Sequence, residues 1–533
     1  EPCRPIKCVG PLRGRECVLV WGSEKLMKSH LPFLLIPILL MTLFWSTDKD
    51  STEILVVLKK PMQLRDDPED PVVVARAPAQ LPPRAVKQMA QAKPGQRFVV
   101  SLGNGESAMV SFTSSQRTVT GGKVLRGSFP GQAGGSTLWV QEGGRWAGTM
   151  NFPDGRRFTL MPRSQGGYEL ERVDLSRSPT CASGQLVYPS EEELATRVRP
   201  LPEGLGQWSP REPLRRLNPE HRPRDENYQR INLRTFPRGY TNSGRQSQVS
   251  LVPFSNRKNK NKRPVGEGGS VTMTSTQTSG GGDEDTMASG KPSVQARQPL
   301  KINMRGGTQV DLLVLYCRSV ASVYGGDNGL KAAAQLAVQN ANEAFSESGA
   351  NVSLRMVHLA PVNYTNAGSI SQDLRNLTFK DKVLADEMNR LRDEHRADLV
   401  TLISDRPAGG VGWLMIRAKG MAKMGVNVLG RSSLRGYVLA HEVGHNMGCQ
   451  HAEGDSGTSA DGLYAWGYGH RFQVVEDNGG SRQCRTVMAY TPGRRIGRFS
   501  NPNKLYRGVA TGSESANNVK VLNAGVEVVS DYR

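Results

Sequence analysis

The chain has 533 residues, a formal net charge of +20 and 37% hydrophobic residues. This length exceeds a typical domain of about 150 residues, which excludes a single small domain. The hydrophobic fraction is low for a chain packed along its whole length, so we expect part of it to be disordered.

The first fifty residues contain a candidate export signal. From Met27 the chain reads MKSHLPFLLIPILLMTLFW, a lysine followed by an apolar run. The run is shorter than the roughly 20 residues of a transmembrane helix and resembles a secretory signal peptide. We predict that 27–50 is a signal peptide, that 1–26 is an artefactual upstream extension, and that the protein is secreted or held in the cell envelope. An uncleaved N-terminal membrane anchor is the alternative.

The next two segments differ in pattern. Residues 51–97 are rich in proline, alanine and charge without a sustained period, which predicts a flexible lead-in. Residues 98–178 contain short apolar runs separated by turn signals such as Gly143-Gly144 and the Pro-Asp-Gly at 153–155. This pattern is typical of strands and hairpins. We interpret 98–178 as a small all-β pro-domain.

Residues 179–302 are predicted to be a disordered, low-complexity basic linker. Between Arg211 and Arg263 there are fourteen Lys and Arg against four Asp and Glu, a net charge of +10, and a Gly/Ser/Thr-rich run follows. Such a segment could bind anionic polymers such as polysaccharides or nucleic acid, or a membrane surface. A solvated, protease-sensitive tether is the alternative. No motif of a nucleic-acid-binding fold accompanies it, and nothing in the sequence indicates an oligomer.

From residue 303 to 533 the pattern becomes globular and strands alternate with helices. The expected strands and helices lie at 310–316, 330–345, 352–359, 383–391, 399–403 and 409–414. Their order, β-α-β-α-β-β followed by one more helix, predicts an α/β (α+β) domain with a mixed sheet and helices packed on it.

The last of these helices carries the motif HEVGHNMGCQH. His441 and His445 are four residues apart, so on a helix they lie on one face and can share a metal ion. Glu442 lies beside them and can reach a water on that metal. Gly448 can adopt a left-handed conformation that ends the helix and returns the chain, so that His451 becomes a third ligand. Three imidazoles with one open position indicate a catalytic zinc site. We expect Ser432 or Ser433 to be the N-cap.

Around this motif the chain resembles the metzincin clan of zinc peptidases. Met488, in TVMAY, follows 37 residues after His451. Several other segments are similar to those of secreted bacterial relatives of the adamalysin/reprolysin group, namely VDLLVLY, DLVTLIS, RTVMAY and FSNPN. The resemblance covers about residues 305–533. It implies that Met488 forms the Met-turn beneath the ligands, and the β-rich segment resembles the pro-segment of such enzymes.

Two positions depart from the adamalysin pattern. Ala452 follows the third histidine, where many adamalysins have Asp. Tyr490, two residues after Met488, resembles a tyrosine of astacins and serralysins. Its hydroxyl could assist the metal in stabilising the oxyanion, or it could be a buried structural residue.

These features predict a secreted zinc-dependent endopeptidase that is made as a zymogen. One catalytic Zn²⁺ would activate a water, Glu442 would act as general base, and the substrates would be proteins or peptides. The alternative is a non-enzymatic extracellular adhesion protein that uses the zinc domain as a scaffold and the basic linker to bind anionic surfaces. A scaffold has no chemical need for Glu442, which favours the enzyme. A requirement for Ca²⁺ is left open.

The cysteines suggest two further roles. Cys449 and Cys484 are predicted to form a disulfide that ties the loop of the third ligand to the approach of the Met-turn, with two free thiols as the alternative. Cys181, in SPTCASG, could fill the fourth metal position in the precursor as a thiolate. A disulfide from Cys181 to Cys317, or an unimportant free thiol, are the alternatives.

Overall fold

The computed structural model describes residues 53–178, 186–195, 307–456, 463–476 and 479–533. The predicted signal peptide and nearly all of the predicted linker, including its basic part, lie outside these ranges. Among the helices of the described residues, none is both long enough and apolar enough to cross a membrane.

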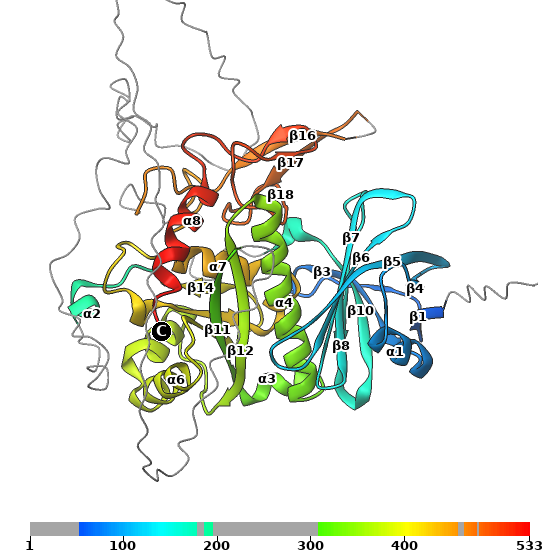
Figure 1. Ribbon diagram of the computed structural model, residues 1–533, viewed down its shortest axis with the longest axis horizontal. Helices are drawn as coiled ribbons and strands as arrows, with labels where there is room; N and C mark the ends of the chain where they lie inside the picture. The colour runs from blue at the N-terminus through cyan, green and yellow to red at the C-terminus, as the bar shows by residue number, and fades with distance from the viewer. Residues whose placement is uncertain (1–52, 179–185, 196–306, 457–462, 477–478) are drawn as a thin grey trace, which may run out of the picture. The chain divides into compact units, whose positions relative to one another are not determined.

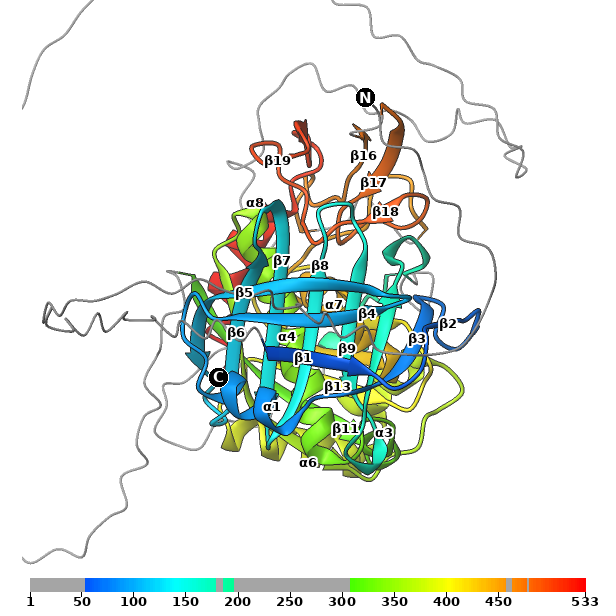
Figure 2. The same cartoon turned by 90° about the vertical axis from the view of Figure 1, so that its right-hand side faces the viewer.

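Ten strands of the N-terminal part form one sheet that closes on itself (Figures 1 and 2). The order is β1-β4-β5-β6-β7-β8-β9-β10-β3-β2, and an additional antiparallel pairing of β1 with β3 completes a barrel-like sheet, which we call the barrel. Its strands are β1 (Glu53–Leu58), β2 (Gln63–Leu64), β3 (Val73–Gln80), β4 (Arg97–Gly103), β5 (Glu106–Arg117), β6 (Lys123–Phe129), β7 (Gln132–Glu142), β8 (Arg145–Asn151), β9 (Arg157–Pro162) and β10 (Tyr168–Val173). Buried aromatic side chains, Phe98, Phe112, Trp139 and Trp146 among them, fill the core of the barrel.

The prediction that 51–97 is a flexible lead-in is wrong. This segment supplies β1, β2, β3 and helix α1 (Pro83–Ala90). Side chains alternate between buried and more exposed along β3, but most of the buried ones are alanines, whose hydrophobic signal is weak. Its partner β10 lies about ninety residues later in the chain, with Ala79 opposite Tyr168. Pairing at that distance, which no local pattern shows, fixes the segment as strand.

The C-terminal part contains a five-stranded mixed sheet, as the sequence predicts (Figure 1). Its order is β12-β11-β13-β15-β14, in which β14 alone runs antiparallel and forms one edge. The strands are β11 (Thr308–Cys317), β12 (Val352–Val362), β13 (Leu399–Ser404), β14 (Gly410–Gly412) and β15 (Val426–Gly430). The helices are α3 (Arg318–Val323), α4 (Asp327–Ser348), α5 (Ile370–Arg375), α6 (Lys382–Glu394), α7 (Val438–Asn446) and α8 (Asn518–Val529), and a π-helical turn spans Asn376–Lys380.

In the described residues between α7 and α8 there are five short strands. They are β16 (Arg471–Val475), β17 (Ser481–Arg485), β18 (Arg494–Arg495), β19 (Leu505–Tyr506) and β20 (Val509–Ala510). The first three form a small sheet, with β17 antiparallel to β16 and parallel to β18. The connection from β17 to β18 carries Met488.

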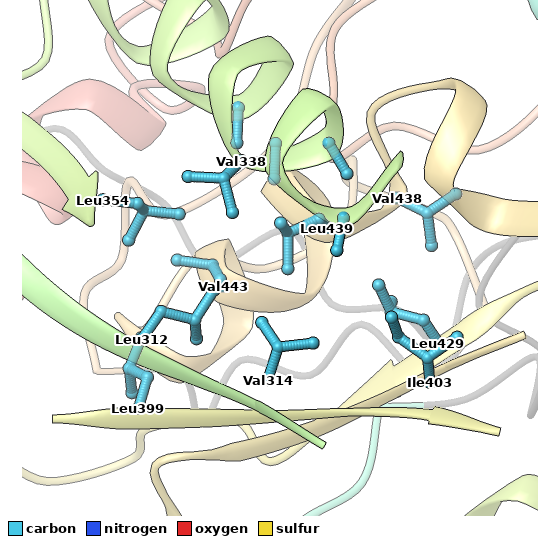
Figure 3. Close-up of a cluster of buried hydrophobic side chains, with 14 of the residues drawn as sticks. Leu312, Val314, Val338, Leu354, Leu399, Ile403, Leu429, Val438, Leu439 and Val443 are labelled. Atoms are coloured by element: carbon cyan, nitrogen blue, oxygen red, sulfur yellow. The ribbon is translucent and has the colours of Figure 1, made fainter. Parts of the chain in front are cut away.

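Helix α4 packs against β12 on one side and against β7 and β8 of the barrel on the other (Figure 1). Toward the sheet it presents apolar residues such as Val338, which lies beside Leu354 and Val443 (Figure 3). It ends at Gly349, which adopts the left-handed conformation with φ +79°. The helix thus belongs to both halves of the described chain.

Polar residues of α4 face the barrel. Lys331 forms a 3.3 Å ion pair with Glu142, and Arg126 donates a 2.7 Å hydrogen bond to Gln339. A Cβ added at Gly143 would come within 2.1 Å of the Asn328 amide oxygen, so this side chain also lies against the barrel. Apolar barrel side chains such as Val124, Leu138 and Val140 belong to the same core as α4. The contact is therefore mixed in polarity.

A buried ion pair joins the barrel to the chain just before α7. Arg435 contacts Glu171 of β10 through two bonds, Nε–Oε2 at 2.5 Å and Nη2–Oε1 at 2.9 Å. Arg163 reaches the same carboxylate at 2.5 Å, and Asp70 lies 3.4 Å from Arg435. Burial alone would raise the pKa of Glu171, but Arg435 and Arg163 outweigh it and hold the pKa below its usual value. The carboxylate is therefore charged at neutral pH.

We predict that Glu171→Gln destabilises the full chain by about 3 kcal/mol. A neutral amide leaves the buried Arg435 and the half-buried Arg163 facing a weaker partner, and breaking one side of a buried pair costs roughly 3–5 kcal/mol. We expect the lower end because Asp70 remains near Arg435. The measurement is denaturant unfolding followed by tryptophan fluorescence. Asp386→Asn, at the exposed pair with Lys382, is the control and should change stability by less than about 1 kcal/mol. Equal effects of the two variants would contradict the prediction.

Candidate active site

Helix α7 starts at Val438, later than the sequence predicts. Neither Ser432 nor Ser433 is its N-cap, because a 3₁₀ turn spans Arg431–Arg435 and Tyr437 occupies the cap position. The Ser433 hydroxyl instead donates a 2.7 Å hydrogen bond to the Gly409 carbonyl, beside the edge strand β14. The earlier start was expected because a serine before an apolar run is a common cap signal, but these two serines bond to the loop that precedes β14.

The three predicted ligands converge on one point. The Nε2 atoms of His441 and His445 are 3.1 Å apart, those of His445 and His451 3.0 Å, and those of His441 and His451 3.3 Å. A tetrahedral metal with bonds of about 2.0–2.1 Å would hold its ligand atoms roughly 3.3 Å apart. All three side chains are buried. The triad can therefore bind a metal ion with little movement.

The other ring nitrogen of each histidine faces a backbone carbonyl. His441 Nδ1 lies 2.8 Å from Val487 O, His445 Nδ1 2.8 Å from Cys449 O, and His451 Nδ1 3.4 Å from Ser456 O. A carbonyl can only accept, so each Nδ1 carries the proton and each Nε2 keeps its lone pair for a metal. The backbone around the site thus selects the tautomer that binding requires.

Burial keeps the imidazoles uncharged. It lowers the pKa of His445 to about 4 and, together with the neighbouring histidines, lowers the pKa values of His441 and His451 well below the usual value. The rings are therefore neutral at pH 7, which is the form that binds metal.

Gly448 provides the turn that the motif predicts. Its φ is +96°, and the Cys449 amide donates a 2.9 Å hydrogen bond back to the Gly444 carbonyl. This backbone region strongly favours glycine. The helix ends at Asn446 and the reversed chain brings His451 to the other two ligands.

Glu442 lies between α7 and the edge strand. Its side chain is buried, and a Cβ added at Gly410 of β14 would fall 2.6 Å from Glu442 Oε1. Glycine at this position therefore leaves room for the carboxylate. The structure thus places a buried carboxylate next to the three histidines and beside β14.

Met488 lies against α7 on the helix face of Gly444. A Cβ added at Gly444 would come within 2.8 Å of the Met488 sulfur. The residue before it, Val487, provides the carbonyl that orients His441. The Tyr490 ring packs against His451 with ring centroids 4.0 Å apart. Both residues thus lie at the metal site, as the resemblance implies.

The predicted disulfide between Cys449 and Cys484 is wrong. Both thiols are free and buried. The Cys449 sulfur lies 3.7 Å from the Asn518 carbonyl in the main core, whereas Cys484 belongs to a separate small cluster with Phe472, Val474 and Ile496. Proximity to the third ligand and to the Met-turn in the sequence therefore did not bring the two side chains together. Cys317 is also a free buried thiol, and Cys181 lies outside the described residues.

A segment that the sequence assigns to the linker lies beside the edge strand. Val187 pairs in parallel with Trp413, and its carbonyl accepts a 3.1 Å hydrogen bond from the Leu414 amide. Helix α2 (Glu191–Ala195) follows, and Ser190 and Glu193 exchange two hydrogen bonds at its start, 2.8 and 3.1 Å long. This Ser-x-x-Glu pattern is a capping box. It is the sequence signal that could have identified the segment as folded.

Together, the mixed sheet, the helix with two histidines, the third histidine after a glycine turn and the methionine beneath them define a metal-dependent hydrolase site. Residues 306–500 match the family model of metallo-peptidase family M12. Over this part of the chain, the sequence and the site are therefore similar to those of metzincin-like zinc metallopeptidases.

Several curated relatives are named peptidyl-Asp metalloendopeptidase. The relative from Stenotrophomonas maltophilia (strain K279a) is 28% identical over 223 residues, which cover 40% of this chain and 50% of the relative. The one from Xanthomonas campestris pv. campestris is 27% identical and covers 40% and 49%, and the one from Pseudomonas aeruginosa is 26% identical and covers 42% and 40%. The chain spans about half the length of the curated relatives it matches first.

Similar solved structures include metalloproteinase-II from Bacteroides fragilis, with 9% identity, a TM-score of 0.28 and coverage of 72% of this chain and 88% of that one. Another is described as a chaperone–substrate complex, with 22% identity, a TM-score of 0.34 and coverage of 43% and 36%. Both TM-scores are low, and these likenesses carry no argument about the fold.

We predict that Gly410→Ala lowers peptide hydrolysis by roughly 10²-fold without loss of metal. The new methyl group would displace the Glu442 carboxylate, and general-base catalysis contributes about 10²–10⁴-fold. The measurements are kcat on a fluorogenic peptide and zinc content by elemental analysis. Gly167→Ala, where an added Cβ makes only ordinary contact, is the matched control. Wild-type turnover in Gly410→Ala would show that the carboxylate does not depend on this space.

Proposed function

We propose that this protein is a secreted zinc-dependent endopeptidase that is made as a zymogen. The observation that carries the proposal is the convergence of three neutral histidine Nε2 atoms, 3.0–3.3 Å apart, with the buried Glu442 beside them at the edge of the sheet. An all-nitrogen set of three ligands suits zinc and leaves one position open for chemistry.

The chemistry follows from the position of each group. A bound zinc ion supplies Lewis acidity that polarises a scissile carbonyl and acidifies a water. Glu442 accepts a proton from the attacking water and later delivers it to the leaving amine. In this proposal Tyr490, whose ring packs against His451, donates a hydrogen bond toward the developing oxyanion.

The substrate is an extended peptide that adds to the edge strand β14. This strand has an antiparallel partner on one side only, and an extended peptide can pair with an exposed sheet edge through main-chain hydrogen bonds. Because the curated relatives are named peptidyl-Asp metalloendopeptidase, we propose cleavage beside aspartate. The alternative of an adhesion scaffold gives no reason for a glycine that makes room for a buried carboxylate.

Latency is supported by the segment beside β14. The hydrogen bond between Val187 and Leu414 uses backbone that an extended substrate would need. The Arg435–Glu171 ion pair is a second contact, which attaches the barrel to the chain just before α7. Polar residues on the barrel face of α4, such as Lys331 and Gln339, can be hydrated if the barrel leaves after cleavage of the chain. A Cys181 thiolate at the open metal position remains part of this proposal.

We predict that Glu442→Gln retains zinc and loses about 10²–10⁴-fold of its peptidase activity, because the base is removed and the ligands remain. Turnover of casein or a fluorogenic peptide, with a chelator control, and zinc analysis of the same sample are the measurements. His441→Ala should instead lower zinc content, since one of three protein ligands is lost. Near wild-type turnover in Glu442→Gln would disprove the role assigned to Glu442.

If the protein is made as a latent precursor, two variants of that precursor should be active before the chain is cleaved. Val187→Asp places a carboxylate where a buried apolar side chain lies beside the edge strand, which costs several kcal/mol. The variant precursor should hydrolyse a short peptide at least about tenfold faster than the wild-type precursor. Cys181→Ser should also be prematurely active if a thiolate closes the site. A Cys181→Ser precursor as latent as the wild type would leave steric cover alone, and a latent Val187→Asp precursor would exclude cover by this segment.

A further inference from the structure

Two arginines lie side by side at the base of the loop that carries Met488. Arg485 ends β17 and Arg495 ends β18, and the two residues are direct partners in this parallel ladder. Both side chains are buried. Partners in a ladder point to the same face of the sheet, so the two guanidiniums share one environment. Like charges opposite one another are unfavourable, and burial increases the penalty.

This arginine pair lies close to the metal ligands. The charge of Arg495 is among the causes that lower the pKa values of His441 and His451, after burial and the neighbouring histidines. The chain between the two arginines includes Met488 and Tyr490, which pack against α7 and His451. A side chain of a peptide bound beside the metal could therefore reach the arginine pair.

Arg485 donates hydrogen bonds both to its own loop and to the N-terminal part of the chain. Its Nε donates to Gly493 O at 2.7 Å and its Nη1 donates to Ala489 O at 2.8 Å. Its Nη2 donates to Ser178 O at 3.1 Å and to Leu175 O at 3.4 Å. Arg495 Nη1 donates to the Ser178 hydroxyl at 3.0 Å. The two guanidiniums thus converge on Ser178, which belongs to the N-terminal part of the chain.

No carboxylate pairs with Arg485 among the ion pairs of the described residues. Burial, together with Arg495 and Arg471, lowers the pKa of Arg485 to about 8, and Asp455 opposes this only weakly. Asp455 itself pairs with Arg471. Arg435, by contrast, is matched by Glu171. Buried Arg392 also bonds to carbonyls, but those of Ala397 and Asp398 belong to its own domain, which is a purely structural arrangement.

Ser178 is followed, nine residues later, by Val187 on the edge strand. The N-terminal part of the chain therefore contacts both the arginine pair and β14. A substrate that replaced this chain on β14 would leave the Nη2 of Arg485 in need of a new acceptor. A carboxylate meets this need best, because guanidinium groups bind carboxylates through paired, charge-assisted hydrogen bonds.

We propose that Arg485 and Arg495 form the subsite that selects an acidic side chain in the substrate, and that Ser178 occupies this subsite in the precursor. The proposal rests on the peptidase function proposed above. It assigns the preference for aspartate to two specificity-determining residues, and it makes the same two residues part of the latency contact.

The first test compares two peptides that differ only by Asp or Asn at one position. The full-length protein is activated by limited trypsin digestion, and kcat/KM is measured for wild type, Arg485→Gln and Arg495→Gln. We expect each variant to lose at least about 100-fold of the wild-type preference for the Asp peptide over the Asn peptide, measured as the ratio of the two kcat/KM values. Arg494→Gln, which removes the neighbouring arginine outside the pair, is the matched control and should keep the Asp preference.

Unchanged Asp preference in both pair variants would overturn the proposal, as would a wild-type enzyme that cleaves peptides without acidic preference. A wild-type protein that binds zinc and cleaves neither peptide would instead contradict the proposed peptidase function. The two failures are therefore distinguishable.

A second test needs no activity and uses the intact precursor. Ser178→Asp places a carboxylate directly against the arginine pair, and we expect Tm to rise by about 2–4 °C. The rise should disappear in the Arg495→Gln and Arg485→Gln backgrounds, and the exposed Ser176→Asp control should show none. A Tm that falls in Ser178→Asp, equally in all backgrounds, would show that the pair does not accept a carboxylate and would overturn the proposal.

Discussion

The site depends on one constraint: three neutral imidazole nitrogens must lie 3.0–3.3 Å from each other, close enough to bind one metal ion. Helical spacing brings His441 and His445 together, and the left-handed turn at Gly448 adds His451. Both features require α7 to be fixed on the sheet. Val438, Leu439 and Val443 pack this helix onto the core, opposite strand residues such as Leu312 and Ile403 (Figure 3). The ligand geometry is thus a product of core packing as well as of the motif.

The N-terminal part of the chain contacts the surroundings of α7 at several places, including three that differ in kind. Glu171 pairs with Arg435 just before the helix, Ser178 receives hydrogen bonds from Arg485 and Arg495 beside the Met488 loop, and Val187 pairs with Trp413 after the edge strand. The first contact is an ion pair, the second consists of hydrogen bonds from arginine side chains, and the third is a backbone pairing. Their joint position supports a role in latency, since a peptide bound at the same site would compete with at least the last two.

Where local patterns are weak, tertiary pairing decided the structure. The lead-in at 51–97 becomes part of the barrel because β3 finds β10, and its alanine-rich face gives little periodic signal. The thiols of Cys449 and Cys484 lie in separate clusters although both are near the site in sequence. The sequence does not indicate the arginine pair, because Arg485 and Arg495 become neighbours only through the parallel β17–β18 pairing.

The sequence by itself determined the histidine triad, the neighbouring Glu442, the glycine turn, the Met488 loop and the alternation of strands and helices from residue 308 onward. These features depend on short-range spacing, which helix geometry converts directly into position. Only the tertiary structure decided what covers the site: the closure of the barrel, the ion pair of Arg435 with Glu171 and the place of Val187 beside β14. Each of these joins residues distant in the chain, and their partners are selected by burial and shape, which no local pattern records.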